Sequence, residues 1–169
     1  MSTLVSNRSG LGSDDIGGLL LSIVAINLIG SSGVVFTSPG SAWFQSLTLP
    51  WFYPPSVLFG IVWTALFTLM GIALYLVYRT PDSKARTNAL ALFGIQMVVN
   101  VAWSPTFFTL ERPDIALGVI VVLFGLIVGT IRWFRVVDRR AALLLVPYLL
   151  WVGFATLLTA SIWYLNAPF

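Results

Sequence analysis

Uncharged polar and aromatic side chains recur at helical spacing in the segment FGIQMVVNVAWSPTFF. Gln96, Asn100, Trp103 and Phe107 follow one another at steps of four, three and four residues, which places them on one face of a helix. Two carboxamides beside two large rings form a surface that can stack on a flat ligand and hydrogen-bond its edge. A second role is also open, because Asn and Gln often join helices to one another within lipid.

Two other segments carry aromatic faces of the same kind. Tyr148, Trp151 and Ala155 share a face in VPYLLWVGFATLLT, and Trp63 and Phe67 share one in a segment nearer the N-terminus. Trp and Tyr are also enriched where helices leave a membrane, so an interfacial belt is the alternative interpretation. Trp151 lies too deep within its apolar segment to fit that alternative well.

The chemistry that this chain lacks is equally informative. It contains no Cys and no His, which excludes the usual zinc, iron–sulfur and His-ligated haem sites, so we expect neither a metal site nor an intrinsic cofactor. No Asp, Glu, Lys or Arg lies in the middle of an apolar segment. Ion pumps and proton-coupled transporters usually need such groups, as does acid–base catalysis, whereas a passive pore or a carrier of lipophilic molecules does not.

Composition predicts a membrane protein with one domain. Of 169 residues, 58% are hydrophobic and only 9% are charged. A helix that crosses a bilayer needs about 20 apolar residues, and lipid admits only helices or closed barrels. The predicted fold class is therefore all-α, an integral membrane bundle over residues 16–166 that follows a flexible tail at 1–15. The five expected transmembrane helices are 16–36, 56–78, 88–110, 114–134 and 141–165.

One connection is unusually long and aromatic. Residues 37–53, between the first two expected helices, include SAWFQSLTLPWFY and carry no charge. Loops of this length are commonly functional or disordered, and the aromatic content argues against disorder.

Lys and Arg predict the orientation. With five crossings, eight of the nine basic residues fall on the side of the N-terminus, and only Arg112 falls on the other. The positive-inside rule then places the N-terminus in the cytoplasm, with the cell membrane as the expected location. No dense basic stripe indicates nucleic-acid binding.

Small residues mark places where helices can approach closely. Gly118, Gly125 and Gly129 share one face of the fourth expected helix, and we expect them to pack within the chain, although a second chain is an alternative. Gly30 and Gly33 in the first helix, like the glycines of the fourth, are candidates for contacts in a dimer.

Several motifs support a resemblance to a known family. The matching residues are Trp43, Phe44, Leu47, Pro50, Pro54, Pro55 and Val62 to Thr64 in the first motif, Gln96, Asn100, Trp103, Ser104, Phe107 and Phe108 in the second, Pro147, Tyr148, Trp151 and Phe154 to Thr156 in the third, and Trp163 to Asn166 at the end. With these motifs in order over residues 30–166, the chain resembles the TspO/MBR family of tryptophan-rich sensory proteins and translocator proteins.

The resemblance implies a bundle of five helices that binds porphyrins and other hydrophobic small molecules in a pocket capped by the 37–53 loop. Protoporphyrin IX or haem is the implied ligand, and a homodimer in the lipid bilayer is the implied assembly. Combined with the helical faces above, the expected ligand-binding residues are Phe44, Trp63, Phe67, Gln96, Asn100, Trp103, Phe107, Tyr148, Trp151 and Ala155.

Some positions depart from the family pattern. Leu49 stands where the family has Lys before the loop proline, and only LNAPF follows Tyr164, so the cholesterol-recognition pattern of animal members is incomplete.

Three functions follow from the resemblance and stay open at this point. The first is a sensor or carrier of tetrapyrroles, which has no catalytic residues. The second is light-dependent porphyrin degradation, which would use Trp63 and Trp151. The third is a non-specific carrier of lipophiles or sterols.

Overall fold

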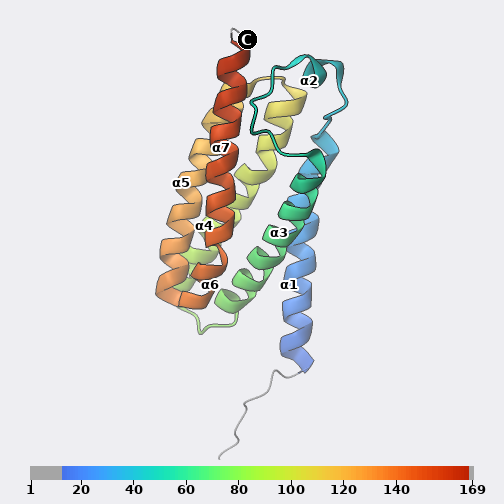
Figure 1. Ribbon diagram of the computed structural model, residues 1–169. Coiled ribbons are helices and arrows are strands. Elements are labelled where there is room, and N and C mark those ends of the chain that lie inside the picture. The colour runs from blue at the N-terminus through green and yellow to red at the C-terminus, as the bar shows by residue number, and fades with distance from the viewer. Residues whose placement is uncertain (1–12, 168–169) are drawn as a thin grey trace, which may run out of the picture.

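The computed structural model describes residues 13–167, and this part of the chain is a bundle of helices without strands (Figure 1). The elements in chain order are α1 (Ser13–Ser31), the 3-10 helix η1 (Ser32–Phe36), α2 (Ala42–Ser46), α3 (Ser56–Tyr78), α4 (Lys84–Ser104), the π-helix η2 (Pro105–Thr109), α5 (Pro113–Val137), α6 (Arg139–Leu144) and α7 (Val146–Asn166). Five segments are long and apolar enough to cross a membrane, namely α1 with η1, α3, α4 with η2, α5, and α6 with α7. The protein is therefore an integral, multi-pass membrane protein, and the predicted fold class is confirmed.

Helix ends differ from the expected positions where polar residues extend a helix beyond its apolar part. α1 begins at Ser13, so residues 13–15 belong to the helix and not to the expected tail, whose residues 1–12 lie outside the described range. α4 begins at Lys84, four residues early, because the Ser83 hydroxyl accepts the backbone N–H of Arg86 at 3.1 Å and caps the first turn.

The last crossing is broken into two helices, although one helix over 141–165 was expected. α6 ends at Leu144 and α7 begins at Val146. Pro147 has no backbone N–H with which to continue the helical ladder, so the break falls just before it. Asp138 caps the start of α6, where its carboxylate accepts the N–H groups of Arg140 at 2.7 Å and of Ala141 at 3.1 Å.

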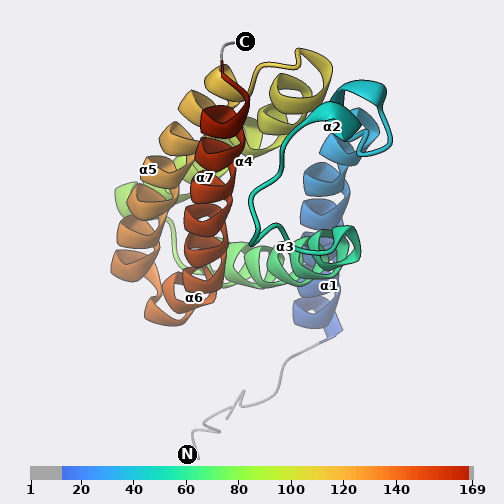
Figure 2. The ribbon, with the colours of Figure 1, turned by 45° about the horizontal axis from the view of Figure 1, so that its top comes forward.

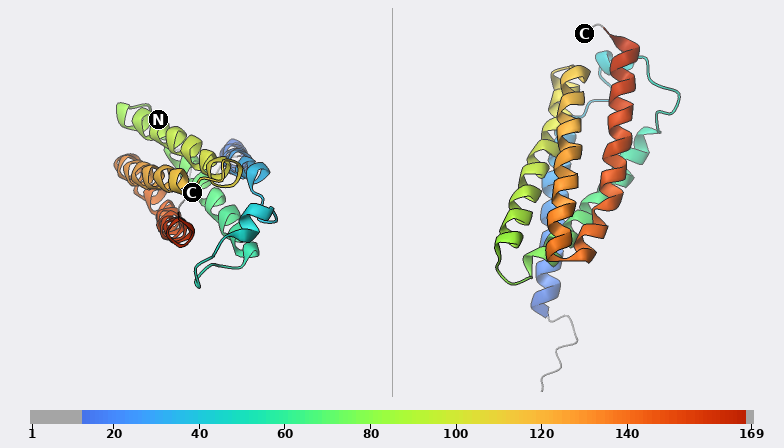
Figure 3. Two further views of the ribbon diagram at one scale, coloured as in Figure 1. Left: turned by 90° about the horizontal axis from the view of Figure 1, so that it is seen from above. Right: turned by 90° about the vertical axis from the view of Figure 1, so that its left-hand side faces the viewer.

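The helices form a bundle with two distinct ends. α1 packs on α3, α4 on α5 and α5 on α7, while α6 packs against both α3 and α5. The end of α7 and α2 lie at one end of the bundle, and α6 and the α3–α4 connection lie at the other, as Figure 1 and the right-hand view of Figure 3 show.

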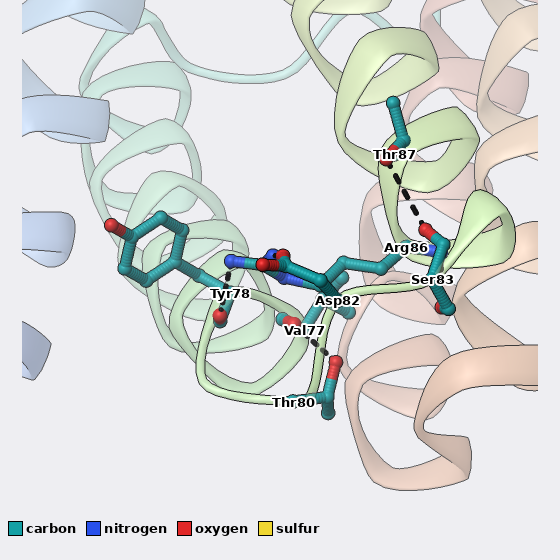
Figure 4. A network of polar contacts seen from close by, with 7 residues as sticks. All are labelled: Val77, Tyr78, Thr80, Asp82, Ser83, Arg86 and Thr87. Atoms are coloured by element: carbon teal, nitrogen blue, oxygen red, sulfur yellow. Dashed lines mark hydrogen bonds and ion pairs between the residues drawn. The ribbon is translucent and has the colours of Figure 1, made fainter.

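Arg86 fixes the α3–α4 connection at the end away from α2 (Figure 4). Its Nη2 donates to the carbonyl of Tyr78 at 2.7 Å, and its guanidinium pairs with Asp82 and lies 5.1 Å from the centroid of the Tyr78 ring. The Thr80 hydroxyl donates to the carbonyl of Val77 at 2.7 Å and closes the last turn of α3. These contacts provide hydrogen-bond donors to carbonyl groups at the end of α3, and lipid has no donors that could replace them.

Gly30 of α1 and Gly33 of η1 contact other helices of the same chain. A Cβ on Gly30 would overlap the ring of Phe67 in α3, and one on Gly33 would lie 3.1 Å from the hydroxyl of Ser104 in α4. The expectation that Gly30 and Gly33 serve a dimer contact is therefore wrong, because helices of one chain already occupy both sites.

The three glycines on one face of α5 differ in their surroundings. A Cβ on Gly129 would lie 2.9 Å from Leu92 of α4, so this glycine packs within the chain as expected. Gly118 and Gly125 are exposed, and a Cβ at either would meet no atom within 4 Å. The expectation of packing within the chain is wrong for these two, which face away from the bundle.

Candidate functional site

The expected lid, residues 37–53, closes one end of the bundle and contains a short helix, α2. The Ser41 hydroxyl accepts the N–H of Phe44 at 3.2 Å and starts this helix. Phe44 is only 6% exposed, and its ring centroid lies 5.6 Å from that of Phe108 and 6.2 Å from that of Tyr53. The lid is therefore packed into the bundle by its aromatic side chains.

The bent end of α4 supplies the surface on which the lid packs. The N–H of Leu110 donates to the carbonyl of Pro105 at 2.9 Å, which is the five-residue step of a π-helix. The wider turn places Phe107 and Phe108 side by side, with ring centroids 4.9 Å apart, and Phe107 also lies 5.6 Å from Trp43 of the lid. Side-chain spacing alone did not predict this change of register.

A cavity of about 360 Å³ lies under the lid, between α1, α3, α4 and α7. This volume falls within the range of small-molecule sites, which is roughly 300–1,000 Å³. Most of its lining is apolar. The expected site residues that border it are Phe44, Trp63, Phe67, Asn100, Trp103, Phe107, Trp151 and Ala155.

The remaining two expected residues, Gln96 and Tyr148, do not border the cavity. Each is 1% exposed, and together with Asn100 they form a buried chain of hydrogen bonds. Asn100 Nδ2 donates to the Tyr148 hydroxyl at 2.9 Å, which donates to Gln96 Oε1 at 2.8 Å. Gln96 and Tyr148 therefore join α4 to α7 behind the cavity, and buried amides often join helices in this way within lipid. Their hydrogen bonds also fix the orientation of the Asn100 side chain toward the cavity.

Aromatic rings from three helices flank the cavity. Trp63 stacks on Phe67 of α3, with ring centroids 5.2 Å apart and an angle of 27°. Trp103 stacks on Phe107 at 5.1 Å and 20°, next to the lid. Trp151 of α7 completes the wall. Rings in such arrangements stack on a planar ligand.

Few polar groups face this aromatic surface. The indole N–H groups of Trp103 and Trp151 are buried, and neither has a hydrogen-bond partner among the described residues. A ligand acceptor that reached either nitrogen would satisfy a donor that the protein leaves unpaired. In the lid, burial raises the pKa of the Tyr53 hydroxyl, so Tyr53 adds no negative charge to the site.

The sequence did not single out several cavity residues. Ser31 and Val34 border it from α1 and η1, and Ser56, Gly60 and Thr64 border it from α3. The signal was present in α3 as small residues at intervals of four, but small residues also occur on helix faces that contact other helices.

The fold and the cavity define a multi-pass membrane protein with a lidded pocket inside its bundle. The profile of the TspO/MBR family matches residues 22–165, so the chain belongs to this family and the resemblance noted in the sequence is confirmed. The chain is 43% identical over 140 residues to the tryptophan-rich protein TspO of Chlorobaculum tepidum, which covers 82% of this chain and 89% of that protein. It is 37% identical over 153 residues to the TspO of Archaeoglobus fulgidus (88% and 97% covered) and 33% identical over 127 residues to the translocator protein of Homo sapiens (73% and 75% covered).

Proposed function

We propose that this protein is a membrane receptor, sensor or carrier that binds porphyrins and related hydrophobic molecules in the cavity under the lid. The observation that carries the proposal is the cavity itself, whose walls hold Trp63, Trp103 and Trp151 on three different helices. A porphyrin is a rigid plane with an apolar body and acceptor groups at its edge. Stacked rings favour such a plane, and Asn100 with the unpaired indole N–H groups suits its edge.

A titration of the purified protein in lipid nanodiscs tests this function. Quenching of tryptophan fluorescence is measured with protoporphyrin IX, haem and cholesterol. Because the chain has no His or Cys to ligate iron, metal-free protoporphyrin should bind at least as tightly as haem. Equal binding of cholesterol and protoporphyrin would instead favour a carrier without preference for porphyrins.

One observation favours a second candidate, the light-dependent degradation of bound porphyrin. Trp63 and Trp151 border the same cavity from α3 and α7, so a bound porphyrin would contact both indoles. Illumination of the porphyrin-loaded protein, followed by chromatography of the pigment, distinguishes degradation from binding alone. Loss of pigment at the same rate in a Trp63→Phe/Trp151→Phe variant would rule out a role for these tryptophans.

We further propose that the N-terminus lies in the cytoplasm and that the protein forms a homodimer. The exposed glycines Gly118 and Gly125 of α5 support the dimer, because they leave room for a second helix to approach. Mass measurement in detergent with Gly125→Leu tests it, since a bulky side chain there should shift the protein toward monomer. An unchanged mass would remove α5 from the dimer contact.

A further inference from the structure

The cavity has an opening on its side in addition to the lid over its end. The exposed residues of the cavity lining that lie outside the lid form this side opening, and they are Ser31, Val34, Ser56, Gly60 and Thr64. The first two belong to the end of α1 and to η1, and the other three follow one face of α3.

The side opening begins where the close contact between α1 and α3 ends. Farther from the lid, the Ser22 hydroxyl donates to the carbonyl of Gly71 at 2.8 Å, and Asn27 Nδ2 donates to the Thr68 hydroxyl at 3.3 Å. The ring of Phe67 then packs directly on Gly30. This last contact forms the edge of the opening farthest from the lid.

Between Gly30 and the lid, the chain turns from α3 toward α4. η1 packs against α4 and η2, and it makes no comparable contact with α3 (the course of these helices can be followed in Figure 2). Gly33 allows this turn, because it faces Ser104 of α4 at a distance that a side chain would disturb. The first two turns of α3 are therefore left without a neighbouring helix on the side of α1.

Both ends of the cavity are closed. At one end, Phe44 is buried, and the lid is hydrogen-bonded to α7 between Thr48 and Asn166. At the other end, Gln96 and Tyr148 fill the bundle and are 1% exposed. The side opening thus offers a ligand the most direct path to the aromatic walls.

The depth of the side opening determines which phase it meets. α3 advances about 12 Å from Ser56 to Thr64, at about 1.5 Å per residue. The headgroup layer on each side of a bilayer is only about 5–8 Å thick, so the opening reaches the acyl chains. No charged side chain lies among the residues that form it.

We propose that hydrophobic ligands enter and leave the cavity sideways, from the acyl-chain region of the bilayer through the side opening, while the lid stays closed. The class of ligand rests on the proposed function. The route rests on the geometry of α1, η1 and α3 alone, so the two can fail separately.

Filling the side opening tests the route. A Cβ on Gly60 would meet no atom within 4 Å, so Gly60→Trp should fold and place its ring in the opening. Gly94 of α4 is equally unobstructed, is exposed and lies outside the cavity lining, so Gly94→Trp is the matched control. In nanodiscs, the association rate of protoporphyrin IX should fall about tenfold or more with Gly60→Trp and stay near the wild-type rate with Gly94→Trp. If the Gly60→Trp protein does not fold, the measurement is made with Gly60→Leu, whose smaller side chain also fills part of the opening.

A second measurement does not depend on porphyrin binding. Because the chain has no Cys, Ala155→Cys introduces a single thiol in the cavity wall. Its reaction with N-ethylmaleimide added through the bilayer should slow about tenfold when Gly60→Trp is also present, and should not slow with Gly94→Trp. Unchanged labelling in the Gly60→Trp background would overturn the side route. If wild-type protein fails to bind protoporphyrin but labelling slows as expected, only the proposed function is lost.

Discussion

The side-chain amide of Asn166 at the end of α7 pairs with the peptide unit of Thr48 in the lid as a neighbouring β-strand would. Its Nδ2 donates to the Thr48 carbonyl at 3.0 Å, and its Oδ1 accepts the Thr48 N–H at 2.8 Å. Among the described residues, these are the only hydrogen bonds between the lid and α7. Asn166 therefore binds the lid to the last helix of the bundle.

Asn166→Ala should loosen the lid without unfolding the bundle. Each lost hydrogen bond contributes about 1 kcal/mol, so backbone amides of residues 41–53 should exchange with deuterium about tenfold faster or more. Hydrogen exchange with mass spectrometry measures this. Asn88→Ala, at an exposed position of α4, is the control and should leave lid exchange unchanged. Equal exchange in both variants would show that aromatic packing alone holds the lid.

Trp151→Ala should weaken protoporphyrin binding about tenfold. An aromatic contact contributes about 1 kcal/mol beyond the buried area, and about 1.4 kcal/mol corresponds to a factor of ten. Trp133→Ala is the control, because Trp133 lies on α5, is 38% exposed and does not border the cavity. Fluorescence titration compares the two variants. Similar losses from both would remove Trp151 from the binding site.

Tyr148→Phe should destabilise the protein by about 2 kcal/mol or more. The change removes one hydroxyl and leaves Asn100 Nδ2 and Gln96 Oε1 unpaired in a buried place, at about 1–3 kcal/mol for each group. Thermal unfolding in detergent measures the loss. Tyr164→Phe, at a position that is 82% exposed, should be neutral. A stable Tyr148→Phe variant would mean that the buried chain of hydrogen bonds contributes little.

Gly71→Ala should destabilise the α1–α3 contact. Its Cβ would lie 2.6 Å from the Cα of Ile23, so backbone must move, and overpacking of this kind costs about 1–3 kcal/mol. Gly94→Ala in α4 meets no atom within 4 Å and should preserve stability or raise it by up to about 1 kcal/mol. Comparison of the melting temperatures of the two variants distinguishes the effect of close packing on stability from the effect of helix propensity. A Gly71→Ala protein as stable as Gly94→Ala would contradict the close approach.

The end of α7 should lie outside the cytoplasm. Arg79, Lys84 and Arg140 are at the end of the bundle opposite the lid, whereas Arg112 is at the lid end, and the positive-inside rule assigns the basic end to the cytoplasm. A C-terminal reporter that works only in the cytoplasm should be inactive, while the same reporter at the N-terminus should be active. The reverse pattern would invert the orientation.

The sequence predicted the crossings and the aromatic faces because both depend on local patterns. A run of apolar residues as long as a bilayer is thick specifies a spanning helix, and the spacing of Trp103 and Phe107 specifies a shared face. The stacking of these two rings in the cavity wall agrees with that expectation.

Features that depend on neighbouring helices were not predictable in this way. Gly125 and Gly129 are equivalent in the sequence, yet Gly129 meets Leu92 and Gly125 meets nothing, because the exposed Gly125 faces away from α4. Tyr148 shares a face with Trp151 but points behind the cavity, since Asn100 and Gln96 offer partners there for its hydroxyl. The π-helix at Pro105 likewise follows from the packing of Phe107 against the lid.

The gap between η1 and α3 would also determine from which phase a ligand reaches the cavity. A site that opens at acyl-chain depth equilibrates with the ligand dissolved in the membrane, and the concentration in the surrounding water enters only through partitioning. A molecule that is enriched about a thousandfold in lipid would reach the opening about a thousandfold more often than one that is not enriched, because the rate of entry follows the local concentration. Solubility in lipid would thus select ligands before any side chain contacts them, and a change in membrane composition would alter occupancy without any change in the protein.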